Sequence, residues 1–433
     1  MAILHKIQEF IDNNMLLEQS NKPVIIGLSG GSDSVALLDI LQKLGYNCIA
    51  AHCNFHLRDE ESIRDENFVK QLTNSYDIKL YKIDFQTTEY AKKHSISIEM
   101  AARNLRYEWF EKIRKEVDGQ AVATGHHLDD NIETVLINLT RGTGLKGLTG
   151  IPAKNGNVVR PLLNTSRKKI KEYLSYNNLS FVEDSTNIST DIVRNKFRHE
   201  IIPHLEKINP SLKLTFADTI QNLKGAYNIY NNDIENIKSK ICKFKDELLY
   251  INIESLLQEK EQSTILYEIL KDYNFNSSTI RQITENLNFE SGKLFYSSTH
   301  SLLKDRTHLI VRPIFSTQNN LEKVKIRSRL LVKDDSFILS KDNRTVHLDA
   351  DKINYPLTVR NWESADSFYP LGMKGKKKLS DFFIDLKINR FEKEKILVLL
   401  SQDEIIWVVG YRIDERFKVD ENTKNIIELQ IEY

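Results

Sequence analysis

Residues 24–38 read VIIGLSGGSDSVALL, and this stretch decides the fold. The apolar run at 24–28 predicts a short buried strand, and the apolar spacing from Val35 onward predicts a helix. Between them, Gly30 and Gly31 permit a tight turn that exposes backbone N–H groups, and the positive end of the helix faces whatever binds there. Strand, glycine turn and helix in this order predict a cradle for an anion such as pyrophosphate.

The predicted cradle consists of six small or polar residues: Ser29, Gly30, Gly31, Ser32, Asp33 and Ser34. It lacks the Gly-Lys-Ser/Thr ending of a Walker A loop. For a lone glycine pair, a turn followed by a helix cap would be an equally good interpretation. Because all six residues stand between a buried strand and an apolar helix, phosphate binding is the stronger hypothesis.

The chain around this stretch alternates strand-like and helix-like segments. Further strands are predicted at 48–52, 80–85 and 121–125, and helices at 64–76, 98–117 and 128–139. Strands separated by helix-length segments predict an α/β fold with a doubly wound parallel sheet that is covered on both faces. In such sheets ligands bind beyond the carboxyl ends of the strands, where Ser29 and His126 both fall.

The character of the sequence changes after Pro203. Residues 212–257 and 263–287 carry apolar side chains at helical spacing, and two strands are predicted at 293–296 and 308–311. A polar stretch at 316–320 predicts a linker.

Short alternating runs follow the linker, at 337–339 and 405–409, and predict a small β-rich region. We therefore divide the chain into three domains: a catalytic domain at 1–210, a mostly helical domain at 211–316 and a small α+β domain at 325–433.

Composition restricts the class of protein. Lys+Arg (61) and Asp+Glu (60) nearly cancel, so any nucleic-acid partner must be met by local basic surface. The three cysteines form no CxxC pair and no zinc or iron–sulfur spacing. The N-terminus reads as an amphipathic helix without the apolar core of a signal peptide, and no stretch approaches the ~20 apolar residues of a membrane span. We expect a cytoplasmic protein with no membrane partner; the sequence leaves oligomeric state open, a homodimer included.

A second polar motif, HHLDDNIET, occupies residues 126–134. Asp130 and Glu133 are three residues apart, so they share one face of a helix. Such a pair can hold an ammonium group, accept its proton or bind a metal, while the plainer interpretation is a helix start enriched in acids. His126 and His127 beside these acids could suggest a metal site, but without a third clustered ligand a hydrogen-bonding role suits both histidines better.

Near the C-terminus lies a basic segment whose side chains are candidates for contacting phosphate: Lys374, Lys376, Lys377, Lys378, Lys387 and Arg390. Aromatic residues flank it, as is common in nucleic-acid contacts. For a bare run of lysines, a solvated loop would be the better interpretation.

Taken together, these motifs resemble a known family. SGGSDS matches the SGGxDS signature of the PP-loop ATP pyrophosphatases, which have a Rossmann-like sheet. HHLDDNIET, with RGTGLKGL at 141–148, is similar to the pattern of the tRNA(Ile)-lysidine synthetase family. Further matches, in order, are HCNFHLR at 52–58, EMAAR at 99–103 with Arg106-Tyr107, EDSTN at 183–187 with Arg194-Asn195 and Arg198, and the C-terminal segment. The family's KIPR reads Lys387-Ile388-Asn389-Arg390 here, and its Gly-Asp reads Ala365-Asp366, which predicts looser turns.

The resemblance implies ATP-dependent addition of L-lysine to the wobble cytidine of the CAU anticodon of tRNA(Ile), through an adenylylated cytidine. It implies ATP binding by the six cradle residues together with His52, Asn54 and Arg103, and Mg²⁺ held by Asp33. It implies catalytic roles for Asp33, for His126, for Asp130 and Glu133 on the lysine amine, and for Arg194 and Arg198 on phosphate or base. The domain at 211–316 would contact the tRNA, and the basic segment of the domain at 325–433 would bind it.

Two alternatives remain at the level of sequence. Another PP-loop enzyme, a tRNA thiolase or an amide-forming adenylylating synthetase, would keep the cradle, but a thiolase would be expected to use paired or cluster-binding cysteines. A non-catalytic RNA-binding protein with a degenerate nucleotide site would not be expected to keep both the SGGSDS loop and the paired acids.

Overall fold

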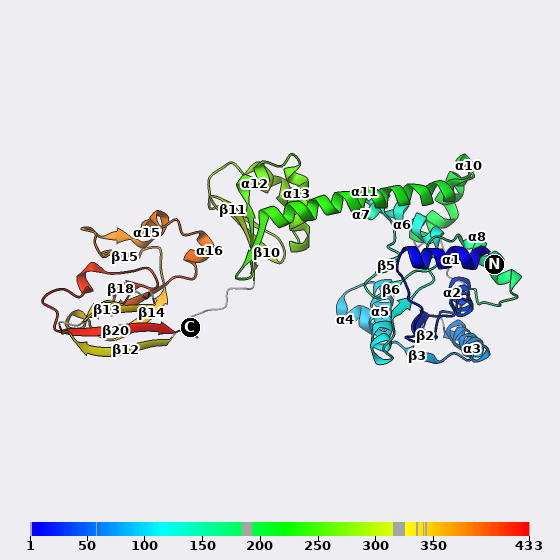
Figure 1. Cartoon of the computed structure of the whole chain (residues 1–433), viewed down its shortest axis with the longest axis horizontal. Helices are drawn as coiled ribbons and strands as arrows, with labels where there is room; N and C mark the ends of the chain where they lie inside the picture. Colours follow the sequence, from blue (N-terminus) through cyan, green and yellow to red (C-terminus); the bar gives the residue numbers. More distant parts are fainter. Residues whose placement is uncertain are drawn as a thin grey trace. The chain divides into compact units, whose positions relative to one another are not determined.

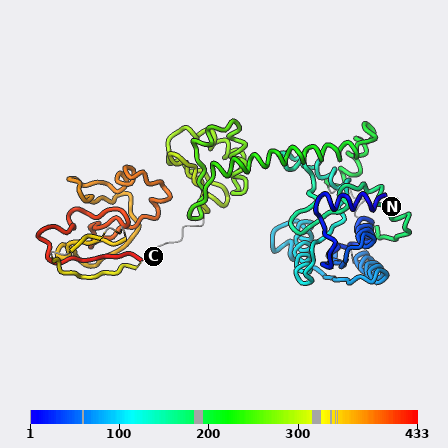
Figure 2. Tube along the Cα trace, in the orientation of Figure 1, coloured from blue at the N-terminus to red at the C-terminus, as the bar shows by residue number. Residues whose placement is uncertain are grey.

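The computed structural model describes residues 2–432 except 58, 184–192, 315–324, 335–336, 341 and 343. The chain folds into two compact units, Met1–Asn231 and Asn232–Tyr433. The helix α11 (Leu212–Ile241) runs from the first unit into the second (Figures 1 and 2). Three predicted features lie outside the described residues: Arg58, the motif residues 184–187 and the linker at 316–320. Within the described part, no helix is long and apolar enough to span a membrane.

The first unit is built on a six-stranded sheet with the order β3-β2-β1-β4-β6-β5. The strands are β3 (Leu80–Asp84), β2 (Cys48–Asn54), β1 (Val24–Gly27), β4 (Ala121–Ala123), β6 (Val158–Val159) and β5 (Lys154–Asn155). All neighbours pair in parallel except β5 with β6. The prediction of a doubly wound parallel sheet is confirmed.

Helices cover both faces of this sheet. One face packs against four helices: α1 (Ala2–Asn13), α2 (Ser32–Lys43), α3 (Asp59–Ser75) and α8 (Arg167–Tyr176). The other face packs against α5 (Ile98–Glu116), through Phe110 and Ile113. Gly27 is required here, because a Cβ at this position would lie 2.9 Å from the Phe110 ring. The described part of the sheet is thus enclosed between two helical layers.

The chain reverses its direction of winding between β1 and β4. From β1 the order runs outward to β2 and β3, whereas β4 lies on the opposite side of β1. The carboxyl ends of β1 and β4 lie at this reversal, which is where such sheets bind ligands. One loop leads into α2 and the other into α6 (Leu128–Arg141).

Further helices complete the first unit: α4 (Thr87–His94), α7 (Leu145–Leu148), α9 (Val193–Lys196), a π-helical turn (Phe197–Ile201) and α10 (Ile202–Ile208). The π-turn packs its buried Phe197 with Ile132 and Leu136 of α6. This contact brings the arginines of 194–198 next to the start of α6.

The second unit begins with a five-stranded sheet in the order β7-β8-β11-β10-β9. Its strands are β7 (Cys242–Lys245), β8 (Leu248–Asn252), β9 (Leu294–Tyr296), β10 (His300–Lys304) and β11 (His308–Pro313), and its helices are α12 (Ile253–Leu257), α13 (Gln262–Leu270) and α14 (Ser277–Glu285). The prediction of helix throughout 212–257 is wrong for β7 and β8. Asp246 and Glu247 both adopt positive φ and turn the chain back into a hairpin.

The rest of the second unit is β-rich, as predicted. A three-stranded sheet contains β12 (Lys325–Val332), β20 (Asn425–Glu432) and β13 (Thr345–Asp349), and a four-stranded sheet contains β14 (Leu357–Asn361), β17 (Leu397–Ser401), β18 (Glu404–Val408) and β19 (Arg412–Ile413). A two-stranded pair, β15 (Ser367–Phe368) and β16 (Lys377–Lys378), precedes α15 (Leu379–Asp385) and α16 (Arg390–Lys393). The strand predicted at 405–409 is β18, whereas 337–339 forms no strand.

Candidate active site

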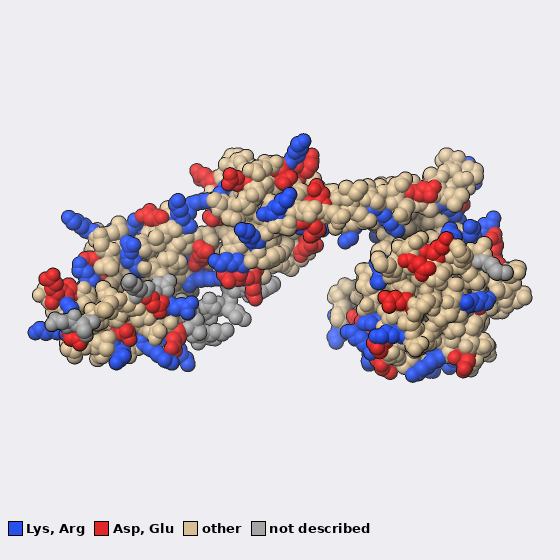
Figure 3. Space-filling model, in the orientation of Figure 1, with Lys and Arg blue, Asp and Glu red and all other residues tan. Residues whose placement is uncertain are grey.

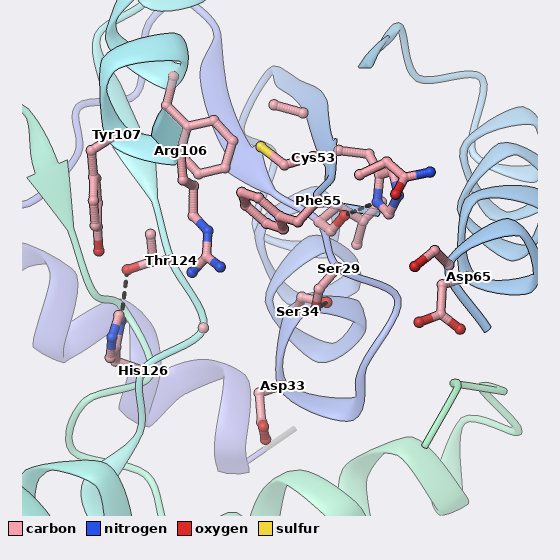
Figure 4. A pocket seen from close by; sticks show the side chains of 18 of the residues that line it. Ser29, Asp33, Ser34, Cys53, Phe55, Asp65, Arg106, Tyr107, Thr124 and His126 are labelled. Carbon is pink, nitrogen blue, oxygen red and sulfur yellow. Dashed lines mark hydrogen bonds between the residues drawn. The ribbon is translucent and has the colours of Figure 1, made fainter. Parts of the chain in front are cut away.

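A cavity of about 440 Å³ opens at the carboxyl edge of the parallel sheet. Figure 4 shows side chains from several elements converging on it. Its lining includes eight of the residues predicted to bind ATP or act in catalysis: Ser29, Asp33, Ser34, His52, Asn54, His126, Asp130 and Arg194. Residues that the sequence placed in separate motifs thus face one space.

The loop after β1 forms one wall of this cavity. Gly30 has a φ of +90°, and a Cβ there would lie 2.9 Å from the Val182 side chain. The hydroxyls of Ser29 and Ser34 share a hydrogen bond of 3.2 Å, and the Ser34 hydroxyl donates to the Gly31 carbonyl at 3.0 Å. These bonds fix the turn that presents the N-terminus of α2 to the cavity.

Asp33, in the first turn of α2, has one carboxylate oxygen that is available to a ligand. Its Oδ1 atom is buried and has no hydrogen-bond partner among the described residues. Burial raises the pKa of Asp33, while the neighbouring His127 opposes that rise. A carboxylate oxygen that is buried and unpartnered suits a cation with a preference for oxygen ligands.

The loop after β4 forms the opposite wall. Gly125 allows it to approach α2, because a Cβ at this position would lie 3.0 Å from the backbone carbon and oxygen of Asp33. The Thr124 hydroxyl and His126 Nδ1 are 3.0 Å apart (Figure 4). Burial lowers the pKa of His126 to about 4, with nearby arginines acting in the same direction and Asp130 against it. The imidazole is therefore neutral at neutral pH.

The start of α6 carries the paired acids. His127 caps the helix, with its backbone N–H donating to Asp130 Oδ2 at 3.0 Å. Arg198 donates to both oxygens of Glu133, at 2.6 and 3.0 Å, and to Asp130 Oδ1 at 3.3 Å. Glu133 is only 1% exposed, and its pKa is raised by burial against the effect of Arg198.

The two acids therefore differ in what they can reach. Asp130 lines the cavity, whereas Glu133 is enclosed by Arg198 and by Arg194, whose Nε is 3.5 Å from Glu133 Oε2. The neighbouring Asp129 is also engaged, since it accepts from the Arg167 N–H at 2.8 Å and pairs with Lys213 at 2.7 Å. Of these acids, Asp130 is placed to meet a ligand directly.

The remaining predicted ATP-binding residues adjoin the cavity, except His52, which lines it. Gly30, Gly31 and Ser32 form its loop, and the Arg103 guanidinium stacks on the Tyr107 ring at 5.1 Å. His52 is buried, with Nδ1 2.8 Å from the Leu28 carbonyl oxygen, so it braces β1 against β2.

The cavity also contains residues to which the motifs assigned no role. Among them are Phe55, Asp65, Arg106, Tyr107 and Thr124. Arg106 lies between Tyr107 and Phe55 in Figure 4, with its guanidinium 5.2 Å from the Phe55 ring centre. Arg106 and Tyr107 belong to one of the matched motifs, so their place in the site could have been predicted from the sequence. Asp65 belongs to none of these motifs, so its place could not.

Comparison with known proteins decides the family. Residues 2–205 match the PP-loop domain, residues 244–314 the TilS substrate binding domain and residues 357–431 the TilS substrate C-terminal domain. The chain is 45% identical to a tRNA(Ile)-lysidine synthase of Parabacteroides distasonis, over 98% of this chain and 99% of that protein. The chain belongs to the tRNA(Ile)-lysidine synthase family. It is thus related to ATP-using ligases that modify tRNA.

A second curated relative carries the same name, and one solved structure is similar over part of the chain. A tRNA(Ile)-lysidine synthase of Bacteroides thetaiotaomicron is 42% identical, over 98% of this chain and 99% of that protein. Among solved structures, the U34-tRNA thiolase NcsA from Methanococcus maripaludis, with its [4Fe-4S] cluster, gives a TM-score of 0.42 at 18% identity, over 51% of this chain and 78% of that one.

Two of the three cysteines, Cys48 and Cys53, stand on β2. Cys53 lines the cavity, but burial raises its pKa to about 12, so the thiol is protonated at neutral pH. Cys48 is buried and free as well. Among the described residues, no group of three or more His, Cys, Asp or Glu side chains is arranged to hold a metal ion.

The basic segment of this family member lies in the second unit. Most of its side chains are exposed: Lys374, Lys376, Lys378, Lys387 and Arg390. Lys377 is half-buried and pairs with Asp385. On the face shown in Figure 3, basic and acidic side chains are intermixed, in line with the near-zero net charge.

The turns around this segment are held despite the missing proline and glycine. Asn389, at the position of the proline, caps α16 by accepting the Glu392 N–H at 3.0 Å. Asp366 accepts two hydrogen bonds of 2.7 Å from Arg360, which fixes the other turn. The looser turns expected from the sequence are not found.

Proposed function

We propose that this protein joins L-lysine to the wobble cytidine of the CAU anticodon of tRNA(Ile) in two ATP-dependent steps. In the first, the cytosine 2-oxygen attacks the α-phosphorus of ATP, an O–P bond forms and pyrophosphate leaves. In the second, the lysine ε-nitrogen attacks C2, a C–N bond forms and AMP leaves. Activation turns a poor oxygen leaving group into a phosphate ester.

One observation carries this proposal: the phosphate-binding loop and Asp130 line the same cavity. The loop supplies backbone N–H groups and hydroxyls to phosphate, and the carboxylate supplies a site for an amine. A reaction that consumes ATP and an amine needs both within reach of one base.

In the first step, the loop at 29–34 and the N-terminus of α2 hold the triphosphate. Asp33 Oδ1, buried and unpartnered, fits Mg²⁺, since that ion prefers oxygen ligands. The ion, when bound, offsets negative charge on the phosphates. Arg194, which lines the cavity, lies where it would offset further charge.

In the second step, lysine must present a neutral amine, although the ordinary pKa of its ammonium group is ~10.4. Asp130 binds the ammonium group and accepts its proton as the amine attacks. Arg198 donates to Asp130 and Glu133 together, so the role we assign to Glu133 is to hold Arg198 and thereby orient Asp130. The neutral His126 hydrogen-bonds base or leaving group without adding charge.

The target cytidine must leave the anticodon stack to enter the cavity, which suits an unpaired loop. The basic segment would contact tRNA phosphates, because most of its side chains are exposed. The reaction would take place in the cytoplasm, where these tRNAs are found.

The test is incubation of the purified protein with ATP, Mg²⁺, radiolabelled L-lysine and unmodified CAU-anticodon tRNA(Ile). We expect label in the RNA that depends on ATP and disappears when the wobble cytidine is replaced. Release of pyrophosphate without incorporation of label would contradict lysine as the acceptor and retain the PP-loop chemistry.

A further inference from the structure

His127 is a side chain of the active-site loop to which the proposed mechanism gives no role. It is 2% exposed and stands at the N-cap of α6. Three carboxylates face its ring: Asp33 Oδ2 at 3.7 Å from Nε2, and Asp130 Oδ2 at 3.5 Å and Asp129 Oδ2 at 3.9 Å from Nδ1. Of the three, Asp33 is the one that faces Nε2.

The hydrogen bonds of His127 determine its tautomer. The backbone N–H of Asp130 points at Nδ1, 3.3 Å away. An amide N–H can only donate, so Nδ1 carries the lone pair, and the proton of the neutral ring is on Nε2. That N–H faces Asp33 Oδ2. The separation of 3.7 Å is slightly beyond a hydrogen bond, and such contacts in active sites tighten when ligand binds.

The two oxygens of Asp33 therefore have different surroundings. Oδ2 faces the His127 ring, whereas Oδ1 is buried without a partner among the described residues. Gly125 also lets the backbone of one loop approach the first turn of α2, because a Cβ there would lie 3.0 Å from the backbone of Asp33. The direction of the carboxylate therefore depends on the side chains that meet it, which are the His127 ring at Oδ2 and the Ser32 hydroxyl.

We propose that His127 is a positioning residue for the metal ion of the nucleotide: its Nε2–H holds Asp33 Oδ2, so that Oδ1 points to the ion. This inference rests on the proposed role of Asp33 in binding Mg²⁺. The same ring caps α6 through Nδ1, so one side chain links the first turn of α2 to the start of α6. Partners that orient a metal ligand in this way contribute substantially to metal affinity.

Two variants separate the two functions of the ring. In His127→Asn, the side-chain oxygen replaces Nδ1 as the helix cap, but the amide is too short to reach Asp33. In His127→Gln, the amide nitrogen occupies the place of Nε2, but glutamine is a poor cap. We expect His127→Asn to keep its Tm and bind metal about tenfold more weakly. We expect His127→Gln to bind metal like the wild type and to lose roughly 2–4 °C in Tm.

The measurement is a titration of the full-length protein with Mn²⁺ in the presence of α,β-methylene-ATP, followed by electron paramagnetic resonance, beside a thermal melt. Asn276→Ala, which removes the cap of α14 in the second unit, controls for a general loss of a helix cap and should change only Tm. Equal metal affinities for His127→Asn and the wild type would overturn the proposal, as would a loss of affinity that merely follows Tm across the three variants.

Asp33→Asn distinguishes this inference from the proposal on which it rests. If Asp33→Asn binds Mn²⁺ like the wild type, Asp33 is not a ligand and both ideas fail. If Asp33→Asn loses affinity but His127→Asn does not, the ligand assignment stands and only the positioning role of His127 is rejected.

Discussion

The cavity of the first unit and the basic segment of the second are built by different means. In the cavity, buried side chains hold one another, as Glu133, Arg198 and Asp130 do. In the basic segment, exposed lysines stand in solvent, and only Lys377 has an ion-pair partner, Asp385, among the described residues. A substitution in the cavity should strongly reduce the rate of one reaction step. A substitution in the basic segment should instead weaken tRNA binding by a smaller factor.

The largest expected effect comes from Asp130→Asn. Asparagine keeps an acceptor for the His127 N–H, so the helix cap survives, but it cannot take a proton. We expect lysine incorporation to fall at least ~100-fold with ATP and tRNA binding largely retained. Asp129→Asn is the matched control, because Asp129 is engaged by Lys213 and the Arg167 N–H. Equal losses of rate in the two variants would remove the distinction drawn between these acids.

Glu133→Gln tests whether the ion pair between Glu133 and Arg198 stabilises the cavity. It leaves the Arg198 guanidinium without the carboxylate to which it donates twice. We expect the free energy of unfolding, measured by urea denaturation, to fall by about 3 kcal/mol. Replacing Arg198 by Met in the same protein should recover much of that loss. A single variant as stable as the wild type would show that the pair does not hold the site together.

Substitutions in the basic segment should have a smaller effect, and should act on tRNA affinity. Replacing Lys374, Lys376 and Lys378 by Ala should weaken tRNA binding roughly tenfold and lower the slope of log K against log salt by about 2. The rate at saturating tRNA should not change. The corresponding triple Arg variant keeps the charge and should bind normally. An unchanged salt slope in the Ala variant would show that the segment does not contact phosphate.

The smallest expected effect is on the dependence of stability on pH. Burial lowers the pKa of His126 from 6.5 to about 4, so between these values the unfolded chain binds a proton that the folded chain does not. Stability therefore falls as pH decreases through this range, by about 1 kcal/mol between pH 7.5 and 5.5. His126→Gln should remove this part of the slope in urea denaturation at several pH values. An identical slope in the variant would contradict the assigned protonation state.

Sequence patterns predicted the parts of the fold that depend on local order. The strand, glycine turn and helix of 24–38, and the alternation that follows, predicted the parallel sheet correctly. The hairpin of β7 and β8 was missed, since apolar residues in short runs satisfy helical and strand spacing alike. Its decisive feature, positive φ at Asp246 and Glu247, involves residues with no strong turn signature such as Asn-Gly.

In the site, spacing predicted which residues share a face but not what lies opposite. Asp130 and Glu133 do lie on the same face of the helix. Arg198, which is 65 residues after Glu133, encloses Glu133 and leaves Asp130 at the cavity. The approach of Gly125 to Asp33 and the tautomer of His127 likewise depend on contacts between distant segments. Contacts between distant segments leave no repeating pattern in the sequence, so the spacing of residues does not predict them.

The central claim is that the two steps use different walls of one cavity, and a step-resolved assay of Asp130→Asn tests it most directly. Pyrophosphate release is measured with tRNA(Ile) and ATP before lysine is added, and AMP release is measured afterwards. The account predicts that the variant releases pyrophosphate like the wild type and fails to release AMP when lysine is supplied. Equal loss of both products would contradict it, because Asp130 would then serve the first step as much as the second.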